Sequence, residues 1–217
     1  MLKKTVLVCS PGNSGSGAIH DLLLSSKVFV NPFGEQEYRM VNDPYGLDNL
    51  YKSFYENNNF HNYSSSLEDF ISYNNFLSNL EVNSNNKKIK LIKNKKRYNF
   101  FINNFVKKII DVEYFAYPQF SKNRLSYFKN INFKIKNFIS SNSIKRPFKL
   151  IIPQKKIFFL NEAKKLLNGI FLINIPSIKK KQQFLINQGV NIFDPLNSSK
   201  YYTNPKIIIV LRDPKSV

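Results

Sequence analysis

A segment rich in glycine and serine near the N-terminus has the residue types of an anion-binding loop. It reads Pro11-Gly-Asn-Ser-Gly-Ser-Gly17 and follows an apolar run. Glycines allow a positive φ and a close approach of the backbone, so successive N–H groups can converge on one anion. A helix after the loop adds unpaired N–H groups and the positive end of its dipole. We therefore expect a phosphate or sulfate ligand here. The residues expected to contribute are Gly12, Gly15 and Gly17 by their backbone and Ser10, Ser14 and Ser16 by their hydroxyls.

Two further segments carry charge where a ligand can be held. Arg212 ends an apolar run that starts at Ile207, and a guanidinium there can donate two hydrogen bonds to one phosphate. A structural pairing of Arg212 with Asp213 is the alternative. The segment Glu35-Gln-Glu-Tyr-Arg39 follows a short apolar run, and charged residues just beyond a strand of an α/β sheet often face the ligand. Solvated acids in a loop are the alternative for its two glutamates.

The loop differs from two common phosphate-binding patterns. Gly17 is followed by Ala18 and Ile19, where a nucleoside triphosphatase has lysine and then serine or threonine. The glycines also lack the Gly-x-Gly-x-x-Gly spacing of a dinucleotide site. ATP hydrolysis and dinucleotide binding are therefore disfavoured, and a purely structural turn remains an alternative.

The residues that flank the loop predict a parallel α/β unit. Residues 5–10 form a nearly continuous β-favouring run, as in a strand covered on both faces. After the loop, Ile19, Leu22 and Leu23 have helical spacing, so we expect them on one buried side of a helix. Residues 27–31 predict a second short strand.

The later sequence predicts more elements of the same kind and one long insertion. The later elements are a turn at 42–46, a short helix at 47–55, a helix with Asn161 as its N-cap that ends before Pro176, and strands within 184–190 and 206–214. Residues 51–156 are richer in asparagine, serine, lysine and aromatics, and we expect a mostly helical insertion or lid there. The fold class is therefore α/β, one domain over residues 1–217 with a central parallel sheet.

The overall composition limits partners and location. The net charge of +19 would favour a polyanionic partner. Only five of the 33 basic residues are arginine, a profile typical of A/T-rich coding, so we expect no nucleic-acid partner. Cys9 is the only cysteine, which excludes a disulfide within the chain. The first apolar run is too short for a membrane span or a signal sequence, so we expect a cytoplasmic protein without a transmembrane segment.

Together, these segments resemble the 3′-phosphoadenosine 5′-phosphosulfate-dependent sulfotransferases, whose domain is a three-layer, P-loop-like α/β fold. In that family a strand-loop-helix cradles the 5′-phosphosulfate, and residues 11–17 match it. A later strand ends in Arg-Asp/Asn-Pro-Arg/Lys, matched here by residues 212–215. Residues 34–39 are similar to the Gly-Glu-x-x-Arg segment of the tyrosylprotein and several bacterial carbohydrate-type members. The resemblance covers roughly residues 3–50 and 184–217 and leaves the middle of the chain unmatched.

The resemblance implies a sulfotransferase with 3′-phosphoadenosine 5′-phosphosulfate as co-substrate and no metal. A sulfuryl group would pass to a hydroxyl or amine of a small molecule or carbohydrate. The residues implied to hold the 5′ side are Gly12, Asn13, Ser14, Gly15, Ser16 and Gly17. Arg212 would bind the 3′-phosphate, and Glu37, with Glu35 as second choice, would accept the proton of the acceptor. Arg39 would orient or pair with Glu37.

Two features depart from the family pattern. Family members usually carry lysine or arginine just before the Ser-Gly, whereas Asn13 here adds a hydrogen-bond donor but no charge. A serine that supplies the second 3′-phosphate ligand would fall beyond Val217, so we expect a chain truncated at its C-terminus. A nucleotide-binding protein without catalysis and a P-loop phosphotransferase are the alternatives.

Overall fold

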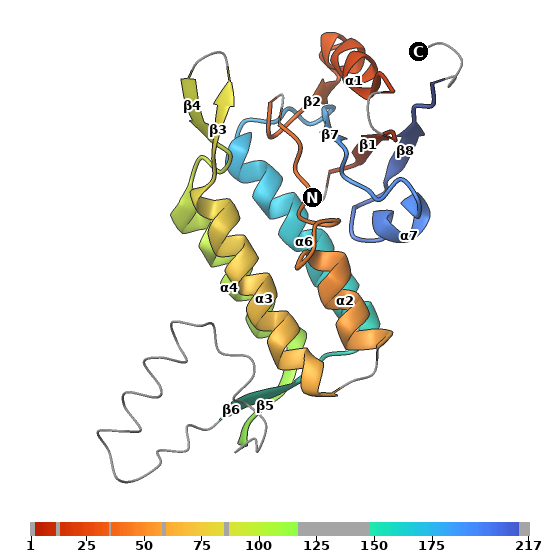
Figure 1. Cartoon of the computed structure of the whole chain (residues 1–217). Helices are drawn as coiled ribbons and strands as arrows, with labels where there is room; N and C mark the ends of the chain where they lie inside the picture. The colour runs from red at the N-terminus through yellow and green to blue at the C-terminus, as the bar shows by residue number, and fades with distance from the viewer. Residues whose placement is uncertain are drawn as a thin grey trace.

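A four-stranded parallel sheet lies at one end of the protein (Figure 1). The computed structural model describes residues 3–11, 14–34, 36–57, 60–84, 87–116 and 148–212. The strands, in their spatial order, are β2 (Phe29–Val30), β7 (Gln183–Asn187), β1 (Thr5–Cys9) and β8 (Lys206–Ile209). Each neighbouring pair is parallel. The expected α/β class with a parallel sheet is confirmed.

The central strand β1 is buried along its whole length, as its apolar sequence predicts. Leu7 and Cys9 contact the core on one face of the sheet, whereas Val6 and Val8 contact the core on the other. This alternation follows from the two-residue repeat of a strand. The edge strand β2 is shorter than the predicted 27–31, because only Phe29 and Val30 pair with β7.

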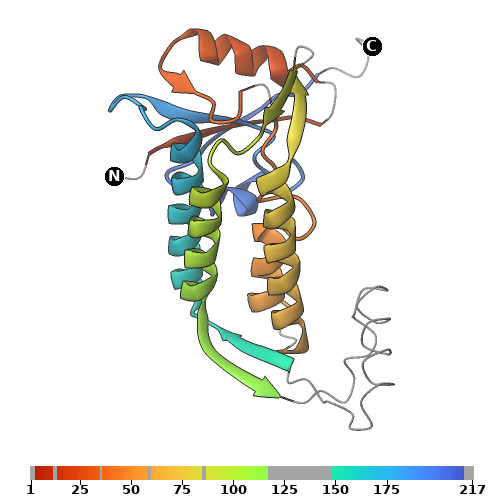
Figure 2. The ribbon, with the colours of Figure 1, turned by 90° about the vertical axis from the view of Figure 1, so that its left-hand side faces the viewer.

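Helix α1 (Ser16–Ser25) covers one face of the sheet, and the ends of the longer helices meet the other (Figure 2). Ile19, Leu23 and Leu24 pack on the β1–β7 face. The expectation that Leu22 joins them is wrong, because 67% of this side chain is exposed. At 100° per residue the buried face of α1 runs through His20 and Leu23 and leaves Leu22 on the solvent side.

The helices form an elongated layer that extends away from the sheet (Figures 1 and 2). They are α2 (Leu47–Tyr55), α3 (Phe60–Asn79), α4 (Lys95–Ile109) and α6 (Lys156–Asn174), with a short α7 (Pro195–Ser199) between β7 and β8. Two antiparallel hairpins interrupt them. One is β3 (Glu81–Ser84) with β4 (Lys87–Lys90), and the other is β5 (Ile110–Ala116) with β6 (Phe148–Pro153). Within the described ranges, none of these helices combines the length and apolar character needed to cross a membrane.

Two predicted helices have different outcomes. The helix expected at 47–55 is confirmed by α2, which follows the predicted turn. The helix expected after Asn161 starts earlier, because α6 begins at Lys156 and Asn161 lies inside it. Asn161 is therefore no N-cap. The true start follows Pro153 and has Lys155 at the cap position without a side-chain hydrogen bond, so it lacks the polar signal from which helix starts are recognised.

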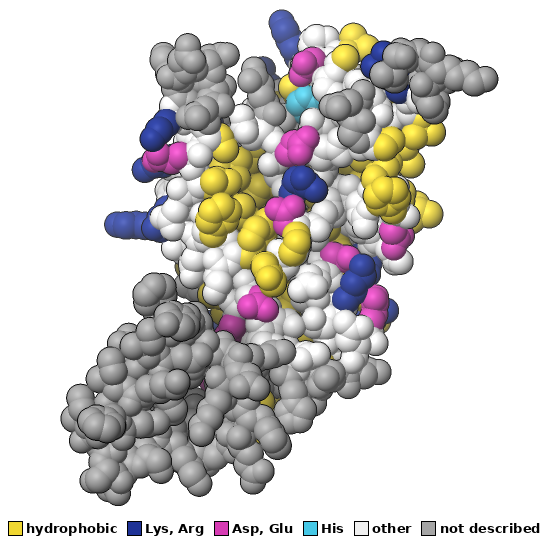
Figure 3. Space-filling model, viewed as in Figure 1, with side chains coloured by type: hydrophobic (Ala, Val, Ile, Leu, Met, Phe, Trp, Pro, Cys, Tyr) yellow, Lys and Arg dark blue, Asp and Glu magenta, His cyan; other side chains and the backbone are white. Residues whose placement is uncertain are grey.

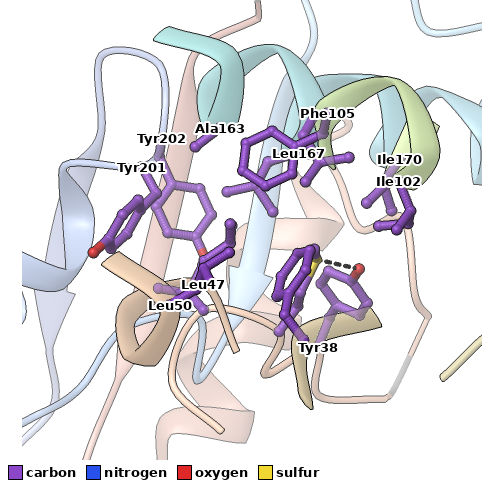
Figure 4. Packing of buried hydrophobic residues seen from close by; sticks show 14 of the residues in the cluster. Tyr38, Leu47, Leu50, Ile102, Phe105, Ala163, Leu167, Ile170, Tyr201 and Tyr202 are labelled. Atoms are coloured by element: carbon purple, nitrogen blue, oxygen red, sulfur yellow. Dashed lines mark hydrogen bonds between the residues drawn. The ribbon is translucent and has the colours of Figure 1, made fainter. Parts of the chain in front are cut away.

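Aromatic rings join the helical layer to the sheet. Phe171 of α6 meets Phe184 of β7 edge-to-face, with ring centroids 5.1 Å apart. Tyr202 donates a 2.6 Å hydrogen bond to the carbonyl of Gly189, the second residue after β7. Figure 4 shows Tyr201 and Tyr202 within the same core as Ala163 and Leu167 of α6. The sheet edge is thus anchored to a rigid apolar core.

Glu162 of α6 pairs with Lys108 of α4 and with Lys165 of its own helix. Its carboxylate is almost fully buried and accepts hydrogen bonds from Lys165 at 2.6 Å and from Lys108 at 3.1 Å. Burial disfavours the charged form, but the two lysines outweigh it, and the pKa of the Glu162 carboxyl lies below its ordinary value. The ionised carboxylate therefore stabilises the folded state.

We expect Glu162→Gln to lower the free energy of unfolding at pH 7 by about 1–2 kcal/mol, since both lysines are partly exposed and screened. The folded-state pKa is depressed, so this contribution is complete above the unfolded pKa near about 4.3 and is lost as the pH falls through the folded value. The difference in free energy of unfolding between the parent and Glu162→Gln, measured by urea unfolding, should therefore be smaller at pH 3.5 than at pH 7. The exposed control Asp69→Asn should unfold like the parent at both pH values; a constant difference for Glu162→Gln would contradict the assignment.

Candidate functional site

The carboxyl ends of three neighbouring strands bring distant segments together. Val8 lies beside Asn187 of β7, and Cys9 lies beside Ile209 of β8. The segments that begin at Ser10, Gln188 and Val210 therefore leave the sheet along one edge, which is where open parallel sheets bind ligands. Cys9 itself is fully buried, and burial raises the pKa of its thiol, so it serves as a core residue.

The predicted anion-binding loop joins β1 to α1. Gly15 is the N-cap of α1 and has a φ of 84°, in the left-handed region that favours glycine. Having no side chain, it leaves the first N–H groups of α1 without a side-chain cap. Ser14 donates to the carbonyl of Pro11. Gly17 lies within α1 and does not use the positive φ that glycine permits. Gly12 and Asn13 lie outside the described residues.

The hydroxyls of Ser10 and Ser16 face each other across the base of this loop. Both residues are buried, and Ser10 Oγ donates a 2.9 Å hydrogen bond to Ser16 Oγ. The amide Nε2 of Gln188 reaches both hydroxyls, at 3.1 Å from Ser10 Oγ and 3.3 Å from Ser16 Oγ. The sequence predicted a strand within 184–190 but did not single out Gln188. Its partner Ser16 is 172 positions away, so no local pattern could reveal the contact.

A buried histidine links α1 to the charged loop. The Nδ2 group of Asn31 lies 3.0 Å from Nε2 of His20 and also donates to the carbonyl of Gly34. Only 3% of His20 is exposed, so its ring is packed within the protein. Gly34 has a φ of 64° and starts the segment that carries the two candidate glutamates. This contact fixes the start of that segment against α1.

The charged segment is arranged differently from the expectation. Arg39 forms its ion pair with Asp43, with Nε 3.3 Å from Oδ1, so the expected pairing with Glu37 is wrong. Asp43 also accepts a 2.7 Å hydrogen bond from Tyr73, which favours it as the partner of Arg39. Glu37 is exposed and forms no ion pair among the described residues. Glu35 lies outside them.

Arg212 leaves the sheet at the same edge as the loop. The N–H of Val210 donates to the carbonyl of Cys9 at 2.9 Å, which extends the β8–β1 pairing by one residue. Two positions later Arg212 is exposed. Asp213 and Lys215, the remaining residues of the matched motif, lie outside the described residues. The β1–β8 register therefore places Arg212 near the end of β1, whereas Glu37 follows β2 at the far side of the sheet.

Charge elsewhere on the protein is mixed. On the face shown in Figure 3, lysine and arginine side chains are interspersed with aspartate and glutamate. Among the described residues, no group of three or more histidine, cysteine, aspartate or glutamate side chains is arranged to hold a metal ion. This face therefore offers no single basic patch.

Comparisons of the chain with protein-family models, with curated proteins and with solved structures find no match. The site is therefore interpreted from its own geometry.

Gly15 and Gly17 offer a matched pair of substitutions. A Cβ at either position meets no atom within 4 Å, so only backbone conformation distinguishes them. Gly15→Ala should destabilise the protein by about 1–2 kcal/mol because of its left-handed φ. Gly17→Ala should be neutral or stabilising by up to about 1 kcal/mol, because alanine favours a helix. Thermal unfolding measures both. Equal changes in the two variants would contradict the left-handed cap.

Proposed function

We propose that the protein is a sulfotransferase that uses 3′-phosphoadenosine 5′-phosphosulfate. The observation that carries the proposal is the β1–α1 loop, with the left-handed Gly15 and the paired hydroxyls of Ser10 and Ser16 at an uncapped helix N-terminus. Such a terminus provides N–H donors and a positive dipole for the 5′-phosphosulfate. Arg212, which follows the adjacent strand, would bind the 3′-phosphate through a bidentate contact.

The order of the strands supports a P-loop-like rather than a dinucleotide-binding domain. In the common dinucleotide-binding order, the first and second strands of the sheet are neighbours. Here β7 lies between β1 and β2. The arrangement of α1, the sheet and the helical layer is consistent with the three layers that the resemblance implies.

The chemistry would be an in-line transfer in which the protein positions groups and stabilises charge. The acceptor oxygen or nitrogen forms a bond to sulfur as the bond from sulfur to the bridging phosphate oxygen breaks. Glu37 would take the acceptor's proton. The engagement of Arg39 with Asp43 leaves the Glu37 carboxylate available as a base. Donors at the start of α1 and the Asn13 amide would act on the developing negative charge, in place of the cation usual in the family.

Isothermal titration with adenosine 3′,5′-bisphosphate tests the proposal. The parent should bind, and Arg212→Ala should bind about 10–100-fold more weakly, because a charged hydrogen-bonded contact is worth about 1.5–3 kcal/mol. Arg97→Ala, an exposed arginine at the start of α4, is the control and should bind like the parent. Equal affinities for the Arg212 variant and the parent would remove its assigned role.

Glu37→Gln separates catalysis from binding. This variant should keep the parent's affinity for adenosine 3′,5′-bisphosphate and lose about 10²–10⁴-fold in the rate of sulfuryl transfer. The assay follows consumption of 3′-phosphoadenosine 5′-phosphosulfate with a panel of hydroxyl and amine acceptors. Glu81→Gln, an exposed glutamate at the start of β3, is the control. A parent that binds the bisphosphate but transfers nothing would favour a nucleotide-binding protein without catalysis.

A further inference from the structure

We infer that Gln188 is a positioning residue that sets the orientation of the Ser16 hydroxyl in the donor site. This inference rests on the proposed function and adds a residue that neither the sequence motifs nor the resemblance assigns. Gln188 lies directly after β7, between the ends of β1 and β2, and its amide reaches into the loop after β1.

The hydrogen-bond arrangement assigns a direction to the Ser16 hydroxyl. The two hydrogens of Gln188 Nε2 are shared among three acceptors, Ser10 Oγ at 3.1 Å, Ser16 Oγ at 3.3 Å and the Ser10 carbonyl at 3.4 Å. Ser10 Oγ donates its own hydrogen to Ser16 Oγ. Ser16 Oγ therefore accepts two hydrogen bonds, and its hydrogen is left to donate outward at the first residue of α1. That is where a 5′-phosphosulfate oxygen would accept it.

The backbone of Gln188 has a strained conformation that tertiary hydrogen bonds hold in place. Its φ is 54°, in the left-handed region that is unfavourable for a non-glycine residue. Its N–H donates to the Val8 carbonyl at 2.8 Å, and its carbonyl accepts from Asn42 Nδ2 at 3.3 Å. Glycine would adopt this conformation without strain, so the backbone alone does not require glutamine. The side-chain amide supplies the reason, since it is the group that bridges the two serines.

Two buried acceptors lie next to Gln188. Oδ1 of Asn187 and Oδ1 of Asn42 are both buried and accept no hydrogen bond from the described residues. One residue precedes Gln188, and the other donates to its carbonyl. Buried acceptors without a donor are unfavourable, and this cost adds to that of the strained backbone at Gln188.

A double-mutant cycle between Gln188 and Ser16 tests the inference, with adenosine 3′,5′-bisphosphate as the probe in isothermal titration. Gln188→Gly relieves the strained φ but removes the amide that donates to the two buried hydroxyls. Thermal unfolding checks that this variant is folded, and it should bind at least fivefold more weakly than the parent. Ser16→Ala should weaken binding to a similar extent. The double variant should bind no more weakly than the single variant with the lower affinity. The reason is that both changes remove the same hydrogen bond, between Gln188 and Ser16.

Two further variants keep the result interpretable. Gln188→Asn tolerates the left-handed backbone but is one methylene too short to bridge the serines, so it should weaken binding as Gln188→Gly does. Gln182→Ala removes a glutamine at the other end of β7, where its amide contacts the Lys27 carbonyl, and should bind like the parent. Parent-like binding by both Gln188 variants, or additive losses in the cycle, would overturn the inference, while binding by the parent would leave the proposed nucleotide site standing. A parent that does not bind the bisphosphate would overturn both.

Discussion

The parallel pairing of β1 with β7 on one side and β8 on the other is the constraint on which the candidate site depends. It joins the start of the chain to strands that lie more than halfway along it, with Val8 beside Asn187 and Cys9 beside Ile209. All five residues of β1 are buried, so a shift in register by one residue would exchange its two buried faces. The register is therefore strongly specified. This register sets the positions of the loop after β1, of Gln188 after β7 and of the residues that lead from β8 to Arg212.

Rigid packing around this edge keeps the polar groups in place. The phenol of Tyr202 holds the Gly189 carbonyl, and a Cβ on Gly189 would come within 2.8 Å of the Ile186 side chain. Glycine is needed at that position for close packing, whereas its neighbour Gln188 has the left-handed backbone conformation. A binding site works best when its donors are fixed before the ligand arrives. The packed Gly189 and the strained Gln188 fix the donors at this edge in that way.

Local sequence patterns predicted the elements with strong signals of their own. The apolar β1, the glycine-serine loop and the turn before α2 each depend on neighbouring residues, and the structure agrees with them. The early start of α6 was missed because Lys155 gives no capping signal. The bridge from Gln188 to Ser16 could not be predicted, because these residues are 172 positions apart. Arg39 and Asp43 are only four positions apart, but the hydrogen bond from Tyr73 of α3 to Asp43 depends on tertiary placement.

The central claim is that this edge binds a nucleotide carrying anions at both its 5′ and 3′ positions. The most direct test compares, on the parent protein, the affinities for adenosine 3′,5′-bisphosphate and for adenosine 5′-monophosphate, which lacks only the 3′-phosphate. We expect the bisphosphate to bind at least tenfold more tightly, because the 3′-phosphate adds a charged contact with Arg212. Equal affinities, or no binding of either nucleotide, would contradict the claim.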